Sequence, residues 1–313
     1  MTNGPITRVA VVGTGLIGAS WATVFLARGM DVSAYDIAPD AEAALRKAVE
    51  RYWPLMRHLG LASGASTARL RFCASVEQAV EAAQFVQESG PERLDFKRAV
   101  FAAMDAATLA SAILASSSSS ITVTEFQDVC QHAERVVLGH PFNPPHLIPL
   151  VEVVGGGRTS QSAVDTAMAF YASCGKHPIR LMKEVRGHIA NRLQAALWQE
   201  AFHLVAAGIA TVADIDAAIA HGPGLRWALL GPFLNLHLSG GRGGITHYLS
   251  HLGPAIEAIW LDLGKVSLTP ECEAAVIAGV QQQLEGRDLP ATIQERDRLL
   301  LELLQAKAAS GLP

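Results

Sequence analysis

The sequence has few of the features that would assign it to a specialised class of protein. Its four cysteines lie far apart without a CxxC pair, so we expect reduced thiols in a cytoplasmic protein rather than a disulfide framework. It contains no HExxH motif and no cluster of cysteine and histidine, and no metal site is therefore expected. Basic residues never form a block with interleaved aromatics, and the net charge of -4 gives no support for nucleic-acid binding.

Long apolar runs are also missing. The longest, residues 99–115, is interrupted by Asp105, Thr108 and Ser111, which predicts a helix end followed by a buried strand rather than a membrane span. Only Arg8 precedes the first apolar strand, so we expect no signal peptide. A hydrophobic content of 50% with 17% charged residues is typical of a globular enzyme, and 313 residues predict two domains. We therefore expect a soluble protein that does not bind membranes.

Strand and helix patterns alternate in the first part of the chain. This alternation predicts a Rossmann-type doubly wound parallel sheet in residues 1–187. From residue 189 onward the pattern is helical, with loops expected at 222–232 and 238–244, so residues 188–313 are predicted to form an all-helical domain. Strands are expected at 8–13, 32–36, 85–88, 112–117 and 135–139, and helices at 16–28, 38–61 with a break at Pro54, 77–83 and 93–107.

A glycine motif, GTGLIG, falls between the first strand and the first helix. Gly13 permits a tight turn, Gly15 lets the backbone approach a pyrophosphate, and Gly18 allows close helix–strand packing. Asp36, at the end of the second strand, can accept hydrogen bonds from a ribose hydroxyl and would repel a 2′-phosphate, which favours NAD over NADP. The alternative, a glycine-rich turn that binds a ligand other than a dinucleotide, would not explain the position of Asp36. The expected cofactor-binding residues here are Gly13, Gly15, Leu16, Ile17, Gly18 and Asp36.

A second chemical pattern is the segment HPFNPPHLIPLVEVV, residues 140–154. His140 directly follows a predicted strand, at the carboxyl edge where open α/β sheets bind ligands. Glu152 lies inside an apolar run that predicts a buried strand, where a carboxylate needs a partner. A histidine oriented by a buried glutamate can act as a general base near neutral pH. On spacing alone, a purely structural pair is an equally good interpretation.

The ordered motifs resemble the L-3-hydroxyacyl-CoA dehydrogenase family along essentially the whole chain. They are GTGLIG with Asp36, SSSSSITV, HPFNPPHLIPLVEVV and GHIANRLQ. The segment 222–241, GPGLRWALLGPFLNLHLSGG, is similar to the branch that contains lambda-crystallin/L-gulonate 3-dehydrogenase and L-carnitine dehydrogenase. The resemblance implies an NAD-binding domain in residues 1–187 and a substrate-binding and dimerisation domain in residues 188–313.

The resemblance also implies roles for individual residues. His140 is expected to be the catalytic base and Glu152 its orienting carboxylate. Ser119 matches the serine that hydrogen-bonds the substrate oxygen, and Asn191 matches an asparagine on the substrate side. Asn143, within HPFNP, is expected to contact the substrate or to lie just behind a residue that does.

Two further matches concern the cofactor. Glu92 and Lys97, in GPERLDFK, match positions that contact the nicotinamide half of NAD. The family commonly has Ser-Asn-Thr-Ser-Ser where this chain has five serines, so Ser117 and Ser118 replace an amide and a threonine. Ser119 itself is preserved, but the polar lining beside it can differ from that of the family.

These residues together predict oxidation of a secondary alcohol. His140 would take the hydroxyl proton, and Ser119 and Asn191 would hold the substrate oxygen. The expected substrate is a small L-3-hydroxy acid of the L-gulonate, L-carnitine or 3-hydroxybutyrate type. A short-chain 3-hydroxyacyl-CoA stays an alternative, although the basic residues of 38–61 are mixed with acids, which disfavours binding of CoA phosphates. A non-enzymatic NAD-binding structural protein is the alternative from another class.

The far end of the substrate is less well defined by the sequence. Arg226 is a candidate for binding a substrate carboxylate, and a structural ion pair is an equally good interpretation. A carnitine cation would call for aromatic side chains such as Trp227, Phe233 and Tyr248. His188 stands where dehydrogenases of the 6-phosphogluconate type have a lysine, which disfavours that group of enzymes. The apolar character of the C-terminal domain predicts a homodimer.

Overall fold

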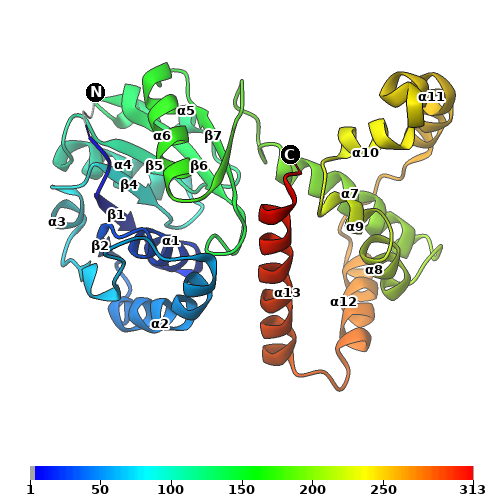
Figure 1. Cartoon of the computed structure of the whole chain (residues 1–313), viewed down its shortest axis with the longest axis horizontal. Helices are drawn as coiled ribbons and strands as arrows, with labels where there is room; N and C mark the ends of the chain where they lie inside the picture. The colour runs from blue at the N-terminus through cyan, green and yellow to red at the C-terminus, as the bar shows by residue number, and fades with distance from the viewer. Residues whose placement is uncertain (1–3, 313) are drawn as a thin grey trace. The chain divides into compact units, whose positions relative to one another are not determined.

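A computed structural model describes residues 4–312 (Figure 1). Contacts within the chain divide it into two compact units, Met1–Arg192 and Leu193–Pro313. The sequence pattern places its boundary slightly earlier, after residue 187. The difference concerns the start of one helix, α7 (Ala190–Ala206), whose first turn belongs to the first unit.

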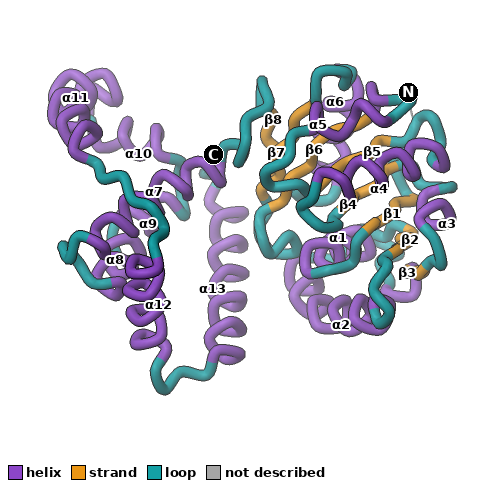
Figure 2. Tube along the Cα trace, turned by 180° about the vertical axis from the view of Figure 1, so that it is seen from behind, coloured by secondary structure: helices purple, strands orange, loops and turns teal. Residues whose placement is uncertain are grey.

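The first unit is built on an eight-stranded sheet with the order β3-β2-β1-β4-β5-β6-β7-β8 (Figure 2). This confirms the Rossmann-type sheet. All neighbouring strands are parallel except β6 and β7, which are antiparallel because the short connection between them has no room for a crossover helix. The strands are β1 (Arg8–Val12), β2 (Asp31–Tyr35), β3 (Leu70–Phe72), β4 (Phe85–Glu88), β5 (Ile113–Ser116), β6 (Val136–Pro141), β7 (Leu150–Gly155) and β8 (His177–Arg180).

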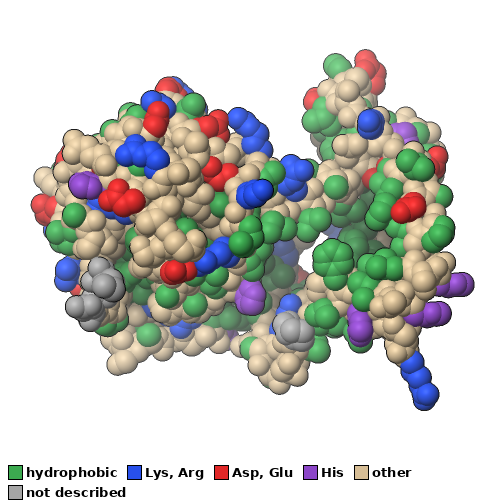
Figure 3. Space-filling model, turned by 90° about the horizontal axis from the view of Figure 1, so that it is seen from above, with side chains coloured by type: hydrophobic (Ala, Val, Ile, Leu, Met, Phe, Trp, Pro, Cys, Tyr) green, Lys and Arg blue, Asp and Glu red, His purple; other side chains and the backbone are tan. Residues whose placement is uncertain are grey.

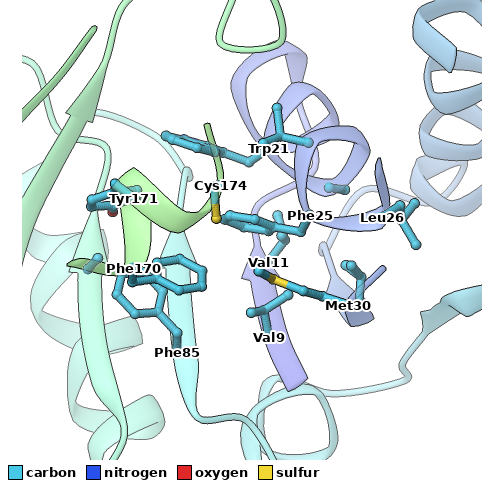
Figure 4. Packing of buried hydrophobic residues seen from close by; sticks show 14 of the residues in the cluster. Val9, Val11, Trp21, Phe25, Leu26, Met30, Phe85, Phe170, Tyr171 and Cys174 are labelled. Atoms are coloured by element: carbon cyan, nitrogen blue, oxygen red, sulfur yellow. The ribbon is translucent and has the colours of Figure 1, made fainter. Parts of the chain in front are cut away.

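Helices cover both faces of this sheet. Alternate residues of β1 point to opposite faces, so Val9 and Val11 pack with α1, α2 and α6, whereas Ala10 and Val12 pack with α3, α4 and α5. Figure 4 shows the aromatic part of the first core, in which Trp21, Phe25, Phe85, Phe170 and Tyr171 lie against one another. The helices are α1 (Leu16–Ala27), α2 (Ala41–Leu59), α3 (Val76–Val80), α4 (Leu94–Ala107), α5 (Val123–Phe126) and α6 (Gln161–Ser173), with 3-10 turns at Thr67–Arg69, Gln127–Val129 and Ala133–Arg135.

The predicted break at Pro54 is wrong, because α2 continues through this residue. Proline removes one backbone hydrogen bond and costs a helix interior about 3 kcal/mol. Leu45, Val49 and Met56, which lie on both sides of Pro54, are each buried in the core that α2 shares with α1. Burial of this apolar face offsets the local cost of the proline.

Within its described residues the second unit contains helices and no strand, as predicted. The expected loop at 222–232 is partly wrong, because the short helix α9 begins at Pro223, with Gly222 as its N-cap. No helix within residues 4–312 is long and apolar enough to cross a membrane. Besides α7, the helices are α8 (Val212–Ala220), α9 (Pro223–Trp227), α10 (Pro232–Ser239), α11 (Gly244–Asp262), α12 (Pro270–Leu284) and α13 (Leu289–Ser310), with a 3-10 turn at Gly241–Gly243.

Candidate active site

At the turn from β1 to α1, two of the three motif glycines stand where a side chain would clash, and the third faces open space. Gly13 has a φ of +88°, and a Cβ there would lie 2.6 Å from the backbone nitrogen of Gly90. A Cβ on Gly18 would lie 1.8 Å from the carbonyl oxygen of Gly13, so only glycine lets the helix pack this closely. Gly15 faces open space, and no side chain caps the helix that begins at Leu16 and Ile17. The amides of the first turn are thus free to bind a pyrophosphate, and the turn fits a dinucleotide.

Asp36 lies beside this turn, directly after β2. Its Oδ2 accepts hydrogen bonds from the amide of Thr14 at 2.6 Å and from the Thr14 hydroxyl at 3.1 Å. The carboxylate borders a cavity of about 580 Å³ whose lining also includes Gly13, Gly15 and Ser89. Apolar side chains, among them Ile37 and Val100, complete the wall. A carboxylate at the rim of an apolar cavity suits a ribose and a base, so the residues present fit NAD.

The structure brings His140 and Glu152 together across the antiparallel pair of β6 and β7. The two residues are directly opposite in the strand register, and His140 Nδ1 lies 3.0 Å from Glu152 Oε2. Both side chains are buried. The other carboxylate oxygen of Glu152 accepts hydrogen bonds from the amides of Ile189 at 2.8 Å and Ala190 at 3.0 Å. Burial opposes ionisation, but these donors together hold the pKa of Glu152 below its ordinary value.

Ser119 completes the group around the imidazole, with its Oγ at 3.3 Å from His140 Nε2. Glu92 holds the turn that carries this serine. One oxygen of Glu92 accepts hydrogen bonds from the amides of Ser119, Ser120 and Ile121 at 2.7–3.2 Å. Burial raises the pKa of Glu92, but the Ser118 hydroxyl, the Ser120 amide and the Lys97 charge outweigh it and hold this pKa below its ordinary value.

Lys97 lies in the interior rather than at the surface of the cavity, with 1% of its side chain exposed. Its Nζ is 2.9 Å and 2.8 Å from the two carboxylate oxygens of Glu88. An oxygen of a second carboxylate, Glu92 Oε2, lies 3.9 Å from Nζ. In this geometry Lys97 orients the two glutamates, and its predicted contact with the nicotinamide half of NAD stays a prediction.

The remaining predicted site residues differ in how closely the structure associates them with the dyad. Asn143 is exposed in the connection between β6 and β7. Asn191 follows directly after Ala190, whose amide binds Glu152, and is half-buried in the first turn of α7. Arg226 is exposed on α9, in the second unit, and not in the glycine-rich loop that the sequence predicts.

The sequence interpretation missed a second histidine at the site. His188 is 2% exposed, its ring centroid lies 4.8 Å from that of His140, and its Nε2 lies 3.0 Å from the carbonyl oxygen of Ser118. Burial lowers the pKa of His188 against the effect of this hydrogen bond, which favours a neutral ring. The available signal was its place in GHIANRLQ, between a glycine and the predicted Asn191.

Comparison with known protein families agrees with this geometry. The 3-hydroxyacyl-CoA dehydrogenase NAD binding domain matches residues 8–185, and the 3-hydroxyacyl-CoA dehydrogenase C-terminal domain matches residues 187–262. The chain belongs to the 3-hydroxyacyl-CoA dehydrogenase family. The branch inferred from segment 222–241 is confirmed by curated relatives. L-carnitine dehydrogenase of Streptomyces griseus is 52% identical over 96% of this chain and 90% of its own length, and that of Pseudomonas putida is 46% identical over 98% and 97%.

Solved structures give the same family and fold. An NAD+-dependent dismutase, 5-formyl-3-hydroxy-2-methylpyridine 4-carboxylic acid 5-dehydrogenase, has a TM-score of 0.84 at 29% identity and covers 98% of this chain and 100% of its own. The 3-hydroxybutyryl-CoA dehydrogenase of Escherichia coli has a TM-score of 0.62 at 30% identity, over 75% of this chain and 50% of its own. This member of the family is an NAD-dependent oxidoreductase that oxidises the 3-hydroxyl of a small 3-hydroxy acid.

Proposed function

We propose that the substrate is L-carnitine, which the enzyme oxidises at its 3-hydroxyl to the 3-keto acid. The observation that carries this proposal is the set of relatives named L-carnitine dehydrogenase, which are 44–52% identical over nearly the whole chain. L-Carnitine is a small 3-hydroxy acid without CoA, in agreement with the mixed charges of α2. Its quaternary ammonium group distinguishes it from L-gulonate and 3-hydroxybutyrate.

The geometry of the dyad supports the following path for the protons. Glu152 accepts the hydrogen of His140 Nδ1, which leaves the lone pair of Nε2 free to take the proton of the substrate hydroxyl. Bound NAD supplies the acceptor for the hydride from the carbinol carbon. The Ser119 hydroxyl, beside Nε2, and the Asn191 amide hold the oxygen as its C–O bond becomes a carbonyl. Glu152 stabilises the imidazolium through the same hydrogen bond.

Phe142 is placed to recognise the cation of L-carnitine. The trimethylammonium group is attached one carbon away from the carbinol, so it must lie close to the base during the reaction. The Phe142 ring meets the His140 ring edge to face, with centroids 5.8 Å apart, and is half-buried. A quaternary ammonium cannot donate a hydrogen bond, and an aromatic face is the favourable partner for it.

Steady-state formation of NADH tests the substrate. We expect the highest kcat/KM with L-carnitine, compared with L-gulonate, L-3-hydroxybutyrate and 3-hydroxybutyryl-CoA. A higher kcat/KM with any of these three would replace L-carnitine as the substrate. If none of the four compounds is oxidised while NADH still binds, the substrate is another 3-hydroxy acid.

Substitution of Phe142 tests recognition of the cation. We expect Phe142→Leu to raise KM for L-carnitine about 5- to 30-fold, because it removes the aromatic face and keeps the apolar bulk. The matched control substrate is 3-hydroxy-5,5-dimethylhexanoate, an analogue of the same shape in which carbon replaces the quaternary nitrogen and the positive charge is absent. An equal rise in KM for both substrates would contradict the cation–π contact, and Phe142→Tyr is expected to retain it.

We also propose that Arg226 binds the substrate carboxylate. Within the described residues its guanidinium forms no ion pair with the protein, which leaves it available to a ligand. We expect Arg226→Ala to raise KM for L-carnitine. The control is Arg242→Ala, which replaces another exposed arginine of the second unit. An unchanged KM would overturn this assignment. Finally, we propose that the enzyme is cytoplasmic, since NAD is an intracellular cofactor and all four cysteines are free thiols. We also propose that it is a homodimer, which the exposed apolar side chains of the second unit support.

A further inference from the structure

A buried glutamine on the central strand β4 makes an unusual set of hydrogen bonds. Gln87 is 0% exposed. Its side-chain nitrogen donates to the Ser117 hydroxyl oxygen at 2.8 Å and to the carbonyl oxygen of Gly139 at 3.3 Å. Its side-chain oxygen accepts from the Tyr171 hydroxyl at 2.5 Å. Ser117 Oγ in turn lies 2.9 Å from Ser89 Oγ. The result is a continuous polar chain through an otherwise apolar interior.

The chemistry of the partners fixes the direction of the hydrogen bonds that the Gln87 side chain makes. A backbone carbonyl only accepts, so Gly139 requires the amide nitrogen of Gln87 to face it. The amide oxygen must then accept from Tyr171, and Ser117 accepts the second amide hydrogen. The Ser117 oxygen keeps a second lone pair, so either serine can be the donor in the hydrogen bond between Ser117 and Ser89.

Ser89 is the outer end of the chain. It is half-buried and lines the dinucleotide cavity next to Gly90. Among the residues that the structure describes, Ser117 is the only hydrogen-bond partner of the Ser89 side chain, so this hydroxyl keeps capacity for a hydrogen bond to a ligand. A hydroxyl that Ser117 holds at the wall of this cavity can donate to an acceptor oxygen of the cofactor.

Tyr171 is the inner end and is held rigidly. Its ring packs against Trp21 and Phe85, with centroids 5.4 Å away in each case (Figure 4). Burial raises the pKa of Tyr171 well above its ordinary value, so the phenol stays a donor throughout the working pH range. Gly139 provides the space, because a Cβ there would lie 1.8 Å from the Tyr171 oxygen. Gly139 directly precedes His140, so the catalytic strand itself accommodates the chain.

We propose that Ser89 is a cofactor-binding residue and that Gln87 is the positioning residue that orders it, acting through Ser117. Ser117 stands where the resemblance places an asparagine, and Gln87 supplies from the neighbouring strand the amide that this position lacks. The acceptor on NAD is a ribose or phosphate oxygen. The inference rests on the use of NAD and is independent of L-carnitine as the substrate.

Titration of NADH binding, followed by nucleotide fluorescence in the absence of substrate, tests the chain. We expect Ser89→Ala and Gln87→Met each to weaken NADH binding about fivefold, the effect of one lost hydrogen bond. Because both substitutions remove the same contact, the double variant should bind NADH no more weakly than whichever single variant has the lower NADH affinity. Ser162→Ala, an exposed serine on α6, is the control and should bind NADH as the wild type does.

Two outcomes would overturn the proposal. Wild-type affinity in Ser89→Ala would remove Ser89 from the cofactor site, and this variant leaves the buried core intact. Additive losses in the double variant would show that Gln87 acts by another route, such as general destabilisation. A rescue variant separates these effects further, because Ser117→Asn in the Gln87→Met background restores an amide at the site and should recover NADH affinity.

Discussion

The buried carboxylates Glu152 and Glu88 are each matched by several hydrogen-bond donors or by an opposite charge. Glu152 is 0% exposed and receives hydrogen bonds from His140 and from two backbone amides. Glu88 is likewise 0% exposed and pairs with Lys97, which is 1% exposed. Leaving one such group unpaired would be strongly destabilising. The charge on Glu152 is thus maintained by the same contacts that orient His140.

Replacement of Glu152 by glutamine tests this coupling. The variant keeps the shape of the side chain and loses the negative charge that stabilises the imidazolium, so we expect kcat to fall by ~100- to 10,000-fold. NADH affinity should stay at the wild-type value, because Glu152 does not line the dinucleotide cavity. Glu134→Gln, at an exposed position, is the control. A kcat within twofold of wild type would remove Glu152 from the dyad.

The free energies of unfolding of the wild type and of Glu152→Gln report the protonation of Glu152. Its pKa in the folded state is lowered from the ordinary value of 4.5, so the ionised form stabilises the fold above that pH. We expect the difference in free energy of unfolding between wild type and Glu152→Gln to be largest near neutral pH. It should shrink as the pH falls below 4.5 through the lowered pKa, as measured by urea unfolding at several pH values. A difference that grows toward acid pH would contradict the ionised state.

The segment between β8 and α7 links two parts of the site. Gly187 and His188 have φ values of +75° and +51°, and His188 is the only non-glycine residue with a positive φ in residues 4–312. This left-handed backbone aims the amides of Ile189 and Ala190 at Glu152. The His188 ring binds the carbonyl of Ser118 at the same time. Local strain of this kind persists where the surroundings fix it, often at functional sites.

Substitution of His188 separates the backbone from the ring. His188→Gly relieves the strained φ and removes the hydrogen bond to Ser118, so we expect little loss of Tm and a clear fall in kcat, about fivefold or more. His188→Asn tolerates the same backbone conformation and is the conservative comparison. NADH affinity, measured in parallel, should not change. If kcat stays at the wild-type value in both variants, the ring does not position the serine turn.

The elements that could be predicted from the sequence are those with strong local patterns. The strand that contains Phe85 and the helix end before Ile113 are marked by apolar periodicity, and the structure confirms them. β3 and β8 were not predicted, because the short segments LRF and HPIR carry too few apolar residues to indicate a strand. The antiparallel β7 was predicted as a buried strand, but its direction depends on the length of a connection. The formation of β3 and β8 and the direction of β7 depend on pairing with the neighbouring strands.

The site divides in the same way. His140 and Glu152 could be proposed from their types and motif, and their contact follows from the strand register. The bond between Gln87 and Tyr171 could not, because these residues are far apart in the chain and meet only when β4 and α6 pack. Lys97 was assigned to the cofactor by resemblance, and its burial against Glu88 depends on the tertiary structure.

At the scale of the whole molecule, the second unit leaves an unusual amount of apolar surface uncovered. Only four of its described residues, at 193–312, are buried, namely Gly240, Gly244, Cys272 and Leu301. Large hydrophobic side chains are exposed instead, including Trp198 at 52% and Trp260 at 65%, and green surface is visible over this unit in Figure 3. Soluble monomers rarely expose contiguous apolar surface of this kind. In the proposed homodimer, a second copy of the chain would cover this surface.

A charge on the apolar face of α7 should weaken such a dimer. Leu193, Leu197 and Trp198 are exposed on this helix, so we expect Trp198→Asp to shift the sedimentation coefficient from that of a dimer toward that of a monomer. The shift should depend on protein concentration, and Tm should fall with it, because association stabilises the folded chain by mass action. Gln282→Glu, at an exposed polar position of α12, is the matched control and should sediment as the wild type does. A wild-type protein that is monomeric and active at every concentration would show that this surface serves another purpose.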